Sequence, residues 1–245
     1  MKRLIFLSLL VSVTTYAGSD TKLIVATGDH YPPLTGKDLP GQGLFTEIVS
    51  KVFKKAHTPF QLEWVEWTRA ESGTEQGDFV AAFPYMQTAE RDRNFEYSVT
   101  IVTLNNVYFV KKDSAMKLAT PADFKDKTIC KPLGYGIEAI VQKALDEKLA
   151  KLDRPKDLIA CYEKLKKGEV DIVPTTDLVG LATLKSHYGN STAFDMVDSK
   201  TPNPLHLIFS KKNPNAKKAL EAFNQAFRAM DTAGEIKVIL NKHLN

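Results

Sequence analysis

The sequence has little cysteine and little net charge, and beyond its N-terminal residues it has no long hydrophobic run. Its 245 residues include two cysteines, and 33 basic against 29 acidic residues give a formal net charge of +4. Such a small excess gives no reason to expect a nucleic acid or a membrane surface as a partner. With 43% hydrophobic and 25% charged residues, the composition is that of an ordinary globular protein.

Motifs of common catalytic and cofactor sites are also missing. The sequence contains no G-x-S-x-G nucleophile elbow, no H-E-x-x-H zinc motif and no phosphate-binding loop. The five histidines lack the spacing of metal ligands, and no motif ties them to the cysteines. We therefore expect no metal or other cofactor, and a binding protein rather than an enzyme.

The N-terminal residues are typical of a cleaved secretory signal. Lys2 and Arg3 precede an apolar run from residue 4 to 13, and residues 15–17 offer small side chains at the two positions that a signal peptidase reads. The run is too short to span a bilayer as a helix. We predict a signal peptide over residues 1–17 and a periplasmic location, with an uncleaved N-terminal anchor as the alternative.

Strands and helices alternate along the rest of the chain. Their order predicts parallel sheets with helices on both faces, because a crossover helix connects each pair of parallel strands. Predicted strands are 23–26, 60–65, 79–83, 107–111, 128–131, 158–159, 170–173 and 205–209. Predicted helices are 44–56, 137–151, 162–167, 216–230 and 234–244, with a short helix or turn at 71–77.

Charged residues follow the apolar run from Phe79 to Phe83, which suits a strand buried on both faces. We expect the chain to leave the sheet at Pro84 and to present Arg91 just past the strand. Ligands of open α/β sheets bind at such places, and a guanidinium matches the two oxygens of a carboxylate. The alternative is a solvated turn in which Arg91 pairs with neighbouring acidic residues.

Two motifs around Arg91 make the chain resemble a known family. Residues 88–91 (T-A-E-R) followed by 95–98 (F-E-Y-S) are similar to the T-x-E-R…F-x-F/Y-S signature of periplasmic solute-binding proteins of the type II fold, family 3. The resemblance implies an α/β fold of two lobes that are joined by a two-strand hinge and close on a ligand. The implied boundaries are 18–109 with 206–245 for lobe 1 and 110–205 for lobe 2, with hinge strands at 107–111 and 205–209.

In the first lobe, the resemblance gives Arg91 the grip on a ligand carboxylate and Tyr31 an aromatic ring stacked on the ligand. Trp67 and Arg69 belong to an element similar to the W-x-R-A of a subgroup, and would supply an apolar wall and a second cation. The alternative for these two is a core tryptophan beside an outward arginine. Gly28 stands where amino-acid binders of the family often carry an acidic residue, and the neighbouring Asp29 is the alternative for that role.

In the second lobe, residues 134–136 (G-Y-G) stand where the family has a glycine-bearing turn, whose free N–H groups at a helix start suit a carboxylate. Asp177 lies one residue from the position of the family's ammonium-binding aspartate, which Thr176 occupies; a helix N-cap is the alternative for Asp177. The full set of implied ligand contacts is Arg91, Tyr31, Trp67, Arg69, Thr88, Gly134, Tyr135, Gly136, Thr176 and Asp177.

The implied function is capture of a small, carboxylate-bearing, amino-acid-like solute by a monomer, for an ABC permease or a membrane receptor. Pro84, Met86 and Pro132 depart from the family's amino-acid binders, which argues against their usual α-amino contacts. The alternative is a periplasmic dehydratase of the cyclohexadienyl type on the same fold. A general acid or base for that chemistry would come from Glu66, His30 or Asp177.

The two cysteines, Cys130 and Cys161, make one disulfide plausible in an exported chain. Cys130 ends a predicted strand, and Cys161 begins a predicted helix just after a neighbouring strand, so their backbones could come within bridging distance. Two buried thiols are the alternative.

Overall fold

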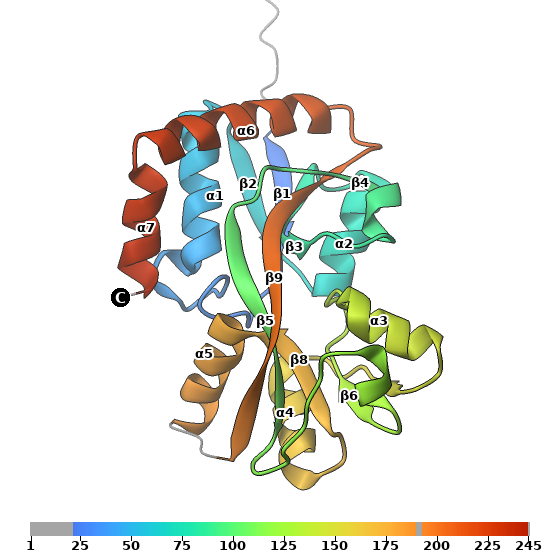
Figure 1. Cartoon of the computed structure of the whole chain (residues 1–245). Coiled ribbons are helices and arrows are strands. Elements are labelled where there is room, and N and C mark those ends of the chain that lie inside the picture. Colours follow the sequence, from blue (N-terminus) through green and yellow to red (C-terminus); the bar gives the residue numbers. More distant parts are fainter. Residues whose placement is uncertain (1–21, 190–192, 245) are drawn as a thin grey trace, which may run out of the picture.

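The computed structural model describes residues 22–189 and 193–244. The predicted signal peptide, residues 1–17, lies outside the described residues. No helix in the two described ranges is long and apolar enough to cross a membrane. Within them, two α/β lobes are joined by a pair of long strands, which confirms the predicted fold class (Figure 1).

The first lobe, drawn uppermost in Figure 1, is built around a parallel sheet. Its elements are β1 (Leu23–Thr27), α1 (Leu44–Lys55), β2 (Phe60–Trp64), α2 (Trp67–Gln76), β3 (Ala81–Met86), β4 (Phe95–Tyr97), α6 (Ala216–Thr232) and α7 (Glu235–Leu244). β1 pairs in parallel with β2 on one side and with β3 on the other. β1 lies between β2 and β3, and the loop after its carboxyl end brings Tyr31 against Tyr135 of the second lobe.

Helix α1 forms because its apolar residues recur at helical spacing and are buried together. Phe45 stacks on Phe83 of β3, and the ring of Phe53 lies 5.0 Å from that of Phe223 in α6. The C-terminal helices therefore complete the core of the first lobe, although they are the last elements of the chain.

The second lobe is inserted between β5 and β9 and has its own core. Its elements are β6 (Thr128–Cys130), α3 (Ala139–Asp146), β7 (Lys151–Asp153), α4 (Leu158–Lys167), β8 (Ile172–Thr176) and α5 (Asp177–Tyr188). β6 pairs in parallel with β7 and β8. Short 3-10 helices at Pro40–Gln42, Arg91–Arg93 and Pro121–Phe124 lie in connections of the two lobes.

The hinge consists of β5 (Val102–Lys111) and β9 (Phe194–Ser210), which pair antiparallel along both lobes. β9 pairs with β3 and β4 in the first lobe, and β5 pairs with β8 in the second. The sheet order is β2-β1-β3-β9-β5-β8-β6-β7. Asn203 donates a hydrogen bond of 2.9 Å to the side chain of Asn106, near the irregular register where the strands pass between the lobes.

Three predictions of local structure are wrong. The chain does not leave the sheet at Pro84, because β3 continues through it to Met86 with a register irregularity. The helix predicted over 137–151 spans only Ala139–Asp146, and its predicted end is strand β7. Residues 158–159 begin α4 instead of forming a strand, because Asp157 accepts a hydrogen bond from the N–H of Ala160 and caps that helix.

Candidate functional site

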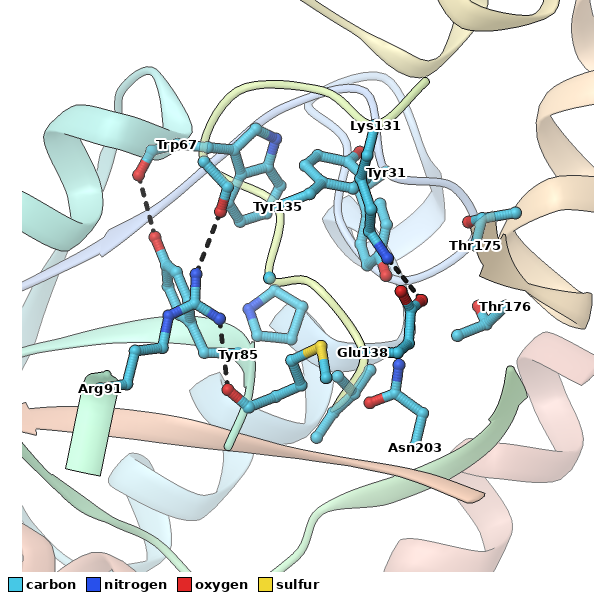
Figure 2. Close-up of a pocket in the computed structure, with 15 residues that line it drawn as sticks. Tyr31, Trp67, Tyr85, Arg91, Lys131, Tyr135, Glu138, Thr175, Thr176 and Asn203 are labelled. Atoms are coloured by element: carbon cyan, nitrogen blue, oxygen red, sulfur yellow. Dashed lines mark hydrogen bonds and ion pairs between the residues drawn. The ribbon is translucent and has the colours of Figure 1, made fainter. Parts of the chain in front are cut away.

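A cavity lies between the two lobes, at the carboxyl ends of β1, β3 and β8 (Figure 2). It is small, with a volume of about 40 Å³. Both lobes and the hinge contribute to its wall. The lining residues are Tyr31, Trp67, Pro84, Tyr85, Met86, Arg91, Lys131, Gly134, Tyr135, Gly136, Glu138, Thr175, Thr176, Asn203 and Leu205.

Aromatic rings from both lobes form one wall of the cavity. Tyr31 contacts Trp67 of the same lobe edge-on, with ring centroids 5.7 Å apart. Tyr135, from the loop between β6 and α3, contacts Tyr31 at 5.3 Å and Trp67 at 6.1 Å, both nearly perpendicular. Burial raises the pKa of Tyr31 and of Tyr135 well above the usual value, so both hydroxyls stay protonated at neutral pH. The wall is thus uncharged and spans the gap between the lobes.

Arg91 lies in the cavity wall and is 5% exposed. Its Nε and Nη2 donate hydrogen bonds of 2.9 and 2.7 Å to the two carboxylate oxygens of Glu71 in α2. Nη1 donates to the carbonyl of Met86 at 3.2 Å, and its charge lies 4.7 Å from the ring centre of Tyr85. Burial acts to lower the pKa of Arg91, but Glu71 outweighs it and raises the pKa. Arg91 is therefore a fixed, permanent cation whose charge is already balanced.

Arg91 also joins the two lobes. Its Nη2 donates a hydrogen bond of 3.1 Å to the carbonyl oxygen of Gly134 in the second lobe. A Cβ atom at Gly134 would lie 2.5 Å from Trp67, and one at Gly136 would lie 2.8 Å from Nη1 of Arg91, so side chains there would hold the lobes apart. The G-Y-G turn does not open a helix as predicted, because α3 begins only at Ala139. It acts instead as a close contact between the lobes.

A second ion pair lies inside the cavity, between Lys131 and Glu138. Lys131 Nζ donates to Glu138 Oε1 at 2.5 Å, and both side chains are 5% exposed. Burial lowers the pKa of Lys131, although the carboxylate of Glu138 counteracts it. Glu138 stands just before α3, yet its side chain does not cap that helix. The side chain points into the cavity, toward Lys131 (Figure 2).

The structure brings seven of the ten predicted residues to the cavity: Arg91, Tyr31, Trp67, Gly134, Tyr135, Gly136 and Thr176. Three do not line it. Arg69 pairs with Asp78 at 2.9 Å and lies over the ring of Phe79. Thr88 accepts a hydrogen bond from the backbone N–H of Arg91, in an outer groove that Glu71 also lines.

Asp177, the third, is the first residue of α5. It accepts hydrogen bonds from the side chain of Asn105 and from the backbone N–H of Leu178. Gly28 has no room for the acidic side chain of the amino-acid binders, because a Cβ atom there would lie 2.2 Å from the indole of Trp67. Asp177 and Asp29, the two carboxylates considered for a ligand ammonium, therefore both lie outside the cavity.

Sequence reasoning does not identify Tyr85, Lys131, Glu138, Thr175 or Asn203 as cavity residues. Tyr85 lies beyond Pro84, where the strand was expected to end. Lys131 directly follows a buried strand, which is a usable signal for a site at a sheet edge. Glu138 falls in a segment predicted as helix, so its turn into the cavity has no signal in the pattern.

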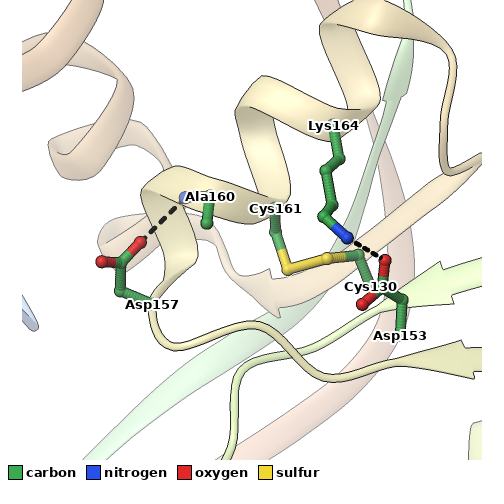
Figure 3. Close-up of a disulfide and its surroundings, with 6 residues drawn as sticks. All are labelled: Cys130, Asp153, Asp157, Ala160, Cys161 and Lys164. Carbon is green, nitrogen blue, oxygen red and sulfur yellow. Dashed lines mark hydrogen bonds and ion pairs between the residues drawn. A yellow bond between two sulfur atoms is a disulfide. The ribbon is translucent and has the colours of Figure 1, made fainter.

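A disulfide lies beside the cavity and fixes the start of the loop that carries Lys131. Cys130 at the end of β6 and Cys161 in α4 are bonded, with Cα atoms 5.5 Å apart, which confirms the predicted pair (Figure 3). Lys164 of α4 also pairs with Asp153 of β7 at 2.5 Å. Both links hold α4 against the strands of the second lobe.

The chain matches one protein family over its described length. The model of the bacterial extracellular solute-binding proteins, family 3, matches residues 23–245. No curated protein matches the chain.

Solved structures share the fold at low sequence identity. An ancestral arginine-binding protein bound to arginine is 22% identical with a TM-score of 0.78, over 91% of this chain and 98% of that one. A histidine kinase sensor domain similar to periplasmic binding proteins is 15% identical with a TM-score of 0.77, over 92% and 96%. The ancestral amino-acid-binding protein AncCDT-1, a precursor of cyclohexadienyl dehydratase, is 23% identical with a TM-score of 0.70, over 91% and 95%.

Proposed function

The chain belongs to the bacterial extracellular solute-binding proteins of family 3, and we propose that it captures a small carboxylate-bearing solute between its lobes for an ABC importer or a membrane sensor. The observation that carries this proposal is the buried Arg91 in the wall of a cavity lined from both lobes. Clefts between domains are where proteins of this architecture bury small ligands.

Arg91 is the proposed carboxylate contact. A guanidinium has five N–H groups, and four of those of Arg91 are used by Glu71, Met86 and Gly134 among the described residues. The remaining N–H is on Nη1, the nitrogen nearest to Gly136 of the second lobe. Glu71 lines an outer groove and not the cavity, so it orients Arg91 from behind. A ligand carboxylate would either bind Arg91 together with Glu71 or take the place of the Glu71 carboxylate.

Ligand capture is proposed to stabilise the closed arrangement of the lobes. Arg91 contacts the ligand on one side and the carbonyl of Gly134 on the other, so a single side chain joins the ligand to both lobes. A membrane partner that recognises the closed form would then respond to ligand. Neighbouring genes for a permease and an ATPase would favour the importer over the sensor.

Binding is favoured over dehydratase catalysis because the predicted acid and base groups lie outside the cavity, and Glu138, the one carboxylate among the lining residues, is paired with Lys131. Glu66, His30 and Asp177 do not line the cavity. The side chains of Glu66 and His30 are 70% and 74% exposed, so they lie far from the water-excluded setting that general acid or base catalysis requires. Turnover of a prephenate-like acid by the purified protein would reverse this preference.

The proposal is tested by mass spectrometry of ligand that co-purifies with the exported protein, followed by calorimetry with that molecule. Arg91→Ala should weaken binding more than tenfold, in line with about 2–5 kcal/mol for truncating one partner of a buried charge pair. Arg93→Ala is the matched control, because Arg93 lies in the same 3-10 helix but is exposed. Equal affinities of Arg91→Ala and the unmodified protein would overturn the proposal.

A further inference from the structure

The side of the cavity away from Arg91 carries polar groups whose hydrogen bonds are incomplete. Among the described residues, four buried atoms of cavity-lining side chains have no hydrogen-bond partner: Glu138 Oε2, Thr175 Oγ1, Thr176 Oγ1 and Asn203 Oδ1. The four residues are 4%, 4%, 1% and 6% exposed. Figure 2 places Glu138, Thr175 and Asn203 around the same part of the cavity, across from Arg91.

These atoms come from three separate parts of the chain. Glu138 lies before α3, Thr175 and Thr176 lie at the end of β8, and Asn203 lies in the part of β9 that passes between the lobes. Buried polar atoms in folded proteins nearly always have a partner, because each one left without a partner destabilises the fold. Four buried atoms that lack hydrogen-bond partners and line one cavity therefore indicate a group that a ligand supplies.

The chemistry of the atoms defines that group. Oε2 of a carboxylate and Oδ1 of an amide can only accept hydrogen bonds, so the ligand must donate them. Lys131 uses one of its three N–H groups on Glu138 Oε1, which leaves donors beside the free oxygen. The Lys131–Glu138 pair carries no net charge, and an ammonium would place a second cation next to Lys131. An uncharged group that has an N–H donor beside a C=O acceptor fits this chemistry. Its N–H groups can donate to the free oxygens, and its C=O can accept from the remaining N–H groups of Lys131.

Resting on the proposed function, we infer that Glu138, Thr175 and Asn203 form a specificity subsite for an amide-type group on the ligand. The ligand class is then a small carboxylate that ends in a neutral carboxamide or cyclic amide. Its carboxylate lies at Arg91 and its N–H donors at Glu138 Oε2 and Asn203 Oδ1. The aromatic wall of Tyr31 and Tyr135 covers the carbon chain between the two ends.

The test compares ligands that differ only at the far end. Titration calorimetry would measure succinamate against levulinate, in which a methyl group replaces the amide nitrogen, and against succinate and 4-aminobutanoate. The analogous series with five and six carbons covers other lengths. The amide should bind about 10- to 100-fold more tightly than its ketone isostere, the range of a hydrogen bond to a charged group.

Glu138→Gln replaces the free acceptor with an N–H donor and keeps an oxygen for Lys131. It should abolish the preference for the amide over the ketone. Thr175→Val removes a hydroxyl without breaking a hydrogen bond among the described residues. It should weaken amide binding and leave the melting temperature unchanged or higher. If the hydroxyl had a structural role, its removal would lower the melting temperature. Thr183→Val is the matched control, because Thr183 Oγ1 is also buried and has no partner in the described part of the chain, but it lies outside the cavity.

The outcomes separate the two proposals. Arg91-dependent binding of carboxylates with no preference for an amide, or a preference that survives Glu138→Gln, would overturn the subsite and leave the proposed function standing. Failure of every carboxylate in the series to bind would count against the proposed function, and the subsite would fall with it.

Discussion

Removal of the Cys130–Cys161 disulfide gives a prediction whose size follows from the chain. The bond closes a loop with a sequence separation of 31 residues. In the chain-entropy model, opening a loop of this length destabilises the folded state by about 3.5–4 kcal/mol. At about 2–4 °C per kcal/mol for a chain of this size, the melting temperature should fall by about 7–15 °C.

The assay is thermal unfolding of the Cys130→Ala/Cys161→Ala double variant beside the unmodified protein, followed by circular dichroism. Thiol titration of the unfolded, unreduced protein checks the starting point and should find no free thiol. A serine variant is less suitable because both sulfurs are fully buried, and a hydroxyl there would lack a partner. A double variant that melts within about 2 °C of the unmodified protein would refute the loop-closure reasoning.

Two other side chains give predictions. Glu71→Gln should tighten binding of a small carboxylate by about 1–2 kcal/mol in calorimetry, because it removes the charge that balances Arg91; weaker binding would mean that Glu71 chiefly positions the arginine. Burial acts to raise the pKa of Glu47, but hydrogen bonds led by Lys242 outweigh it and lower the pKa to about 2 from 4.5. Glu47 therefore stabilises the fold above pH 4.5, and this contribution disappears as the pH falls toward 2. In urea unfolding, Glu47→Gln should be about 1–2 kcal/mol less stable at pH 7 and equal to the unmodified protein at pH 2; parallel pH profiles would contradict this.

Periodic patterns in the sequence were sufficient to predict alternating strands and helices, and the resemblance to a known family supplied the two-lobe arrangement. α1 shows its apolar stripe in the order of its residues, and the strand β1 begins with the apolar run L-I-V-A. Arg91 could be placed at the cavity between the lobes because it belongs to a motif of the family. The predicted ends of helices and strands were less accurate where a single side chain sets the boundary, as Asp157 does at the start of α4.

The charge balance of the cavity could not be predicted from the sequence. Glu71 and Arg91 are 20 positions apart, and whether they meet depends on how α2 lies against β3. Glu138 was expected on a helix face, and only the fold of its loop turns it onto Lys131. Electrostatic pairs of this kind have no periodicity, since each depends on the tertiary position of two segments.

The contact of Trp67 with Tyr135 across the cavity has a practical consequence. The protein has two tryptophans, Trp64 and Trp67, and the second touches a ring of the opposite lobe. Separation of the lobes would hydrate that indole, so its emission colour would follow the angle between them. The intrinsic fluorescence of Trp67 would thus report the opening of the lobes, and ligands could be screened without any attached dye.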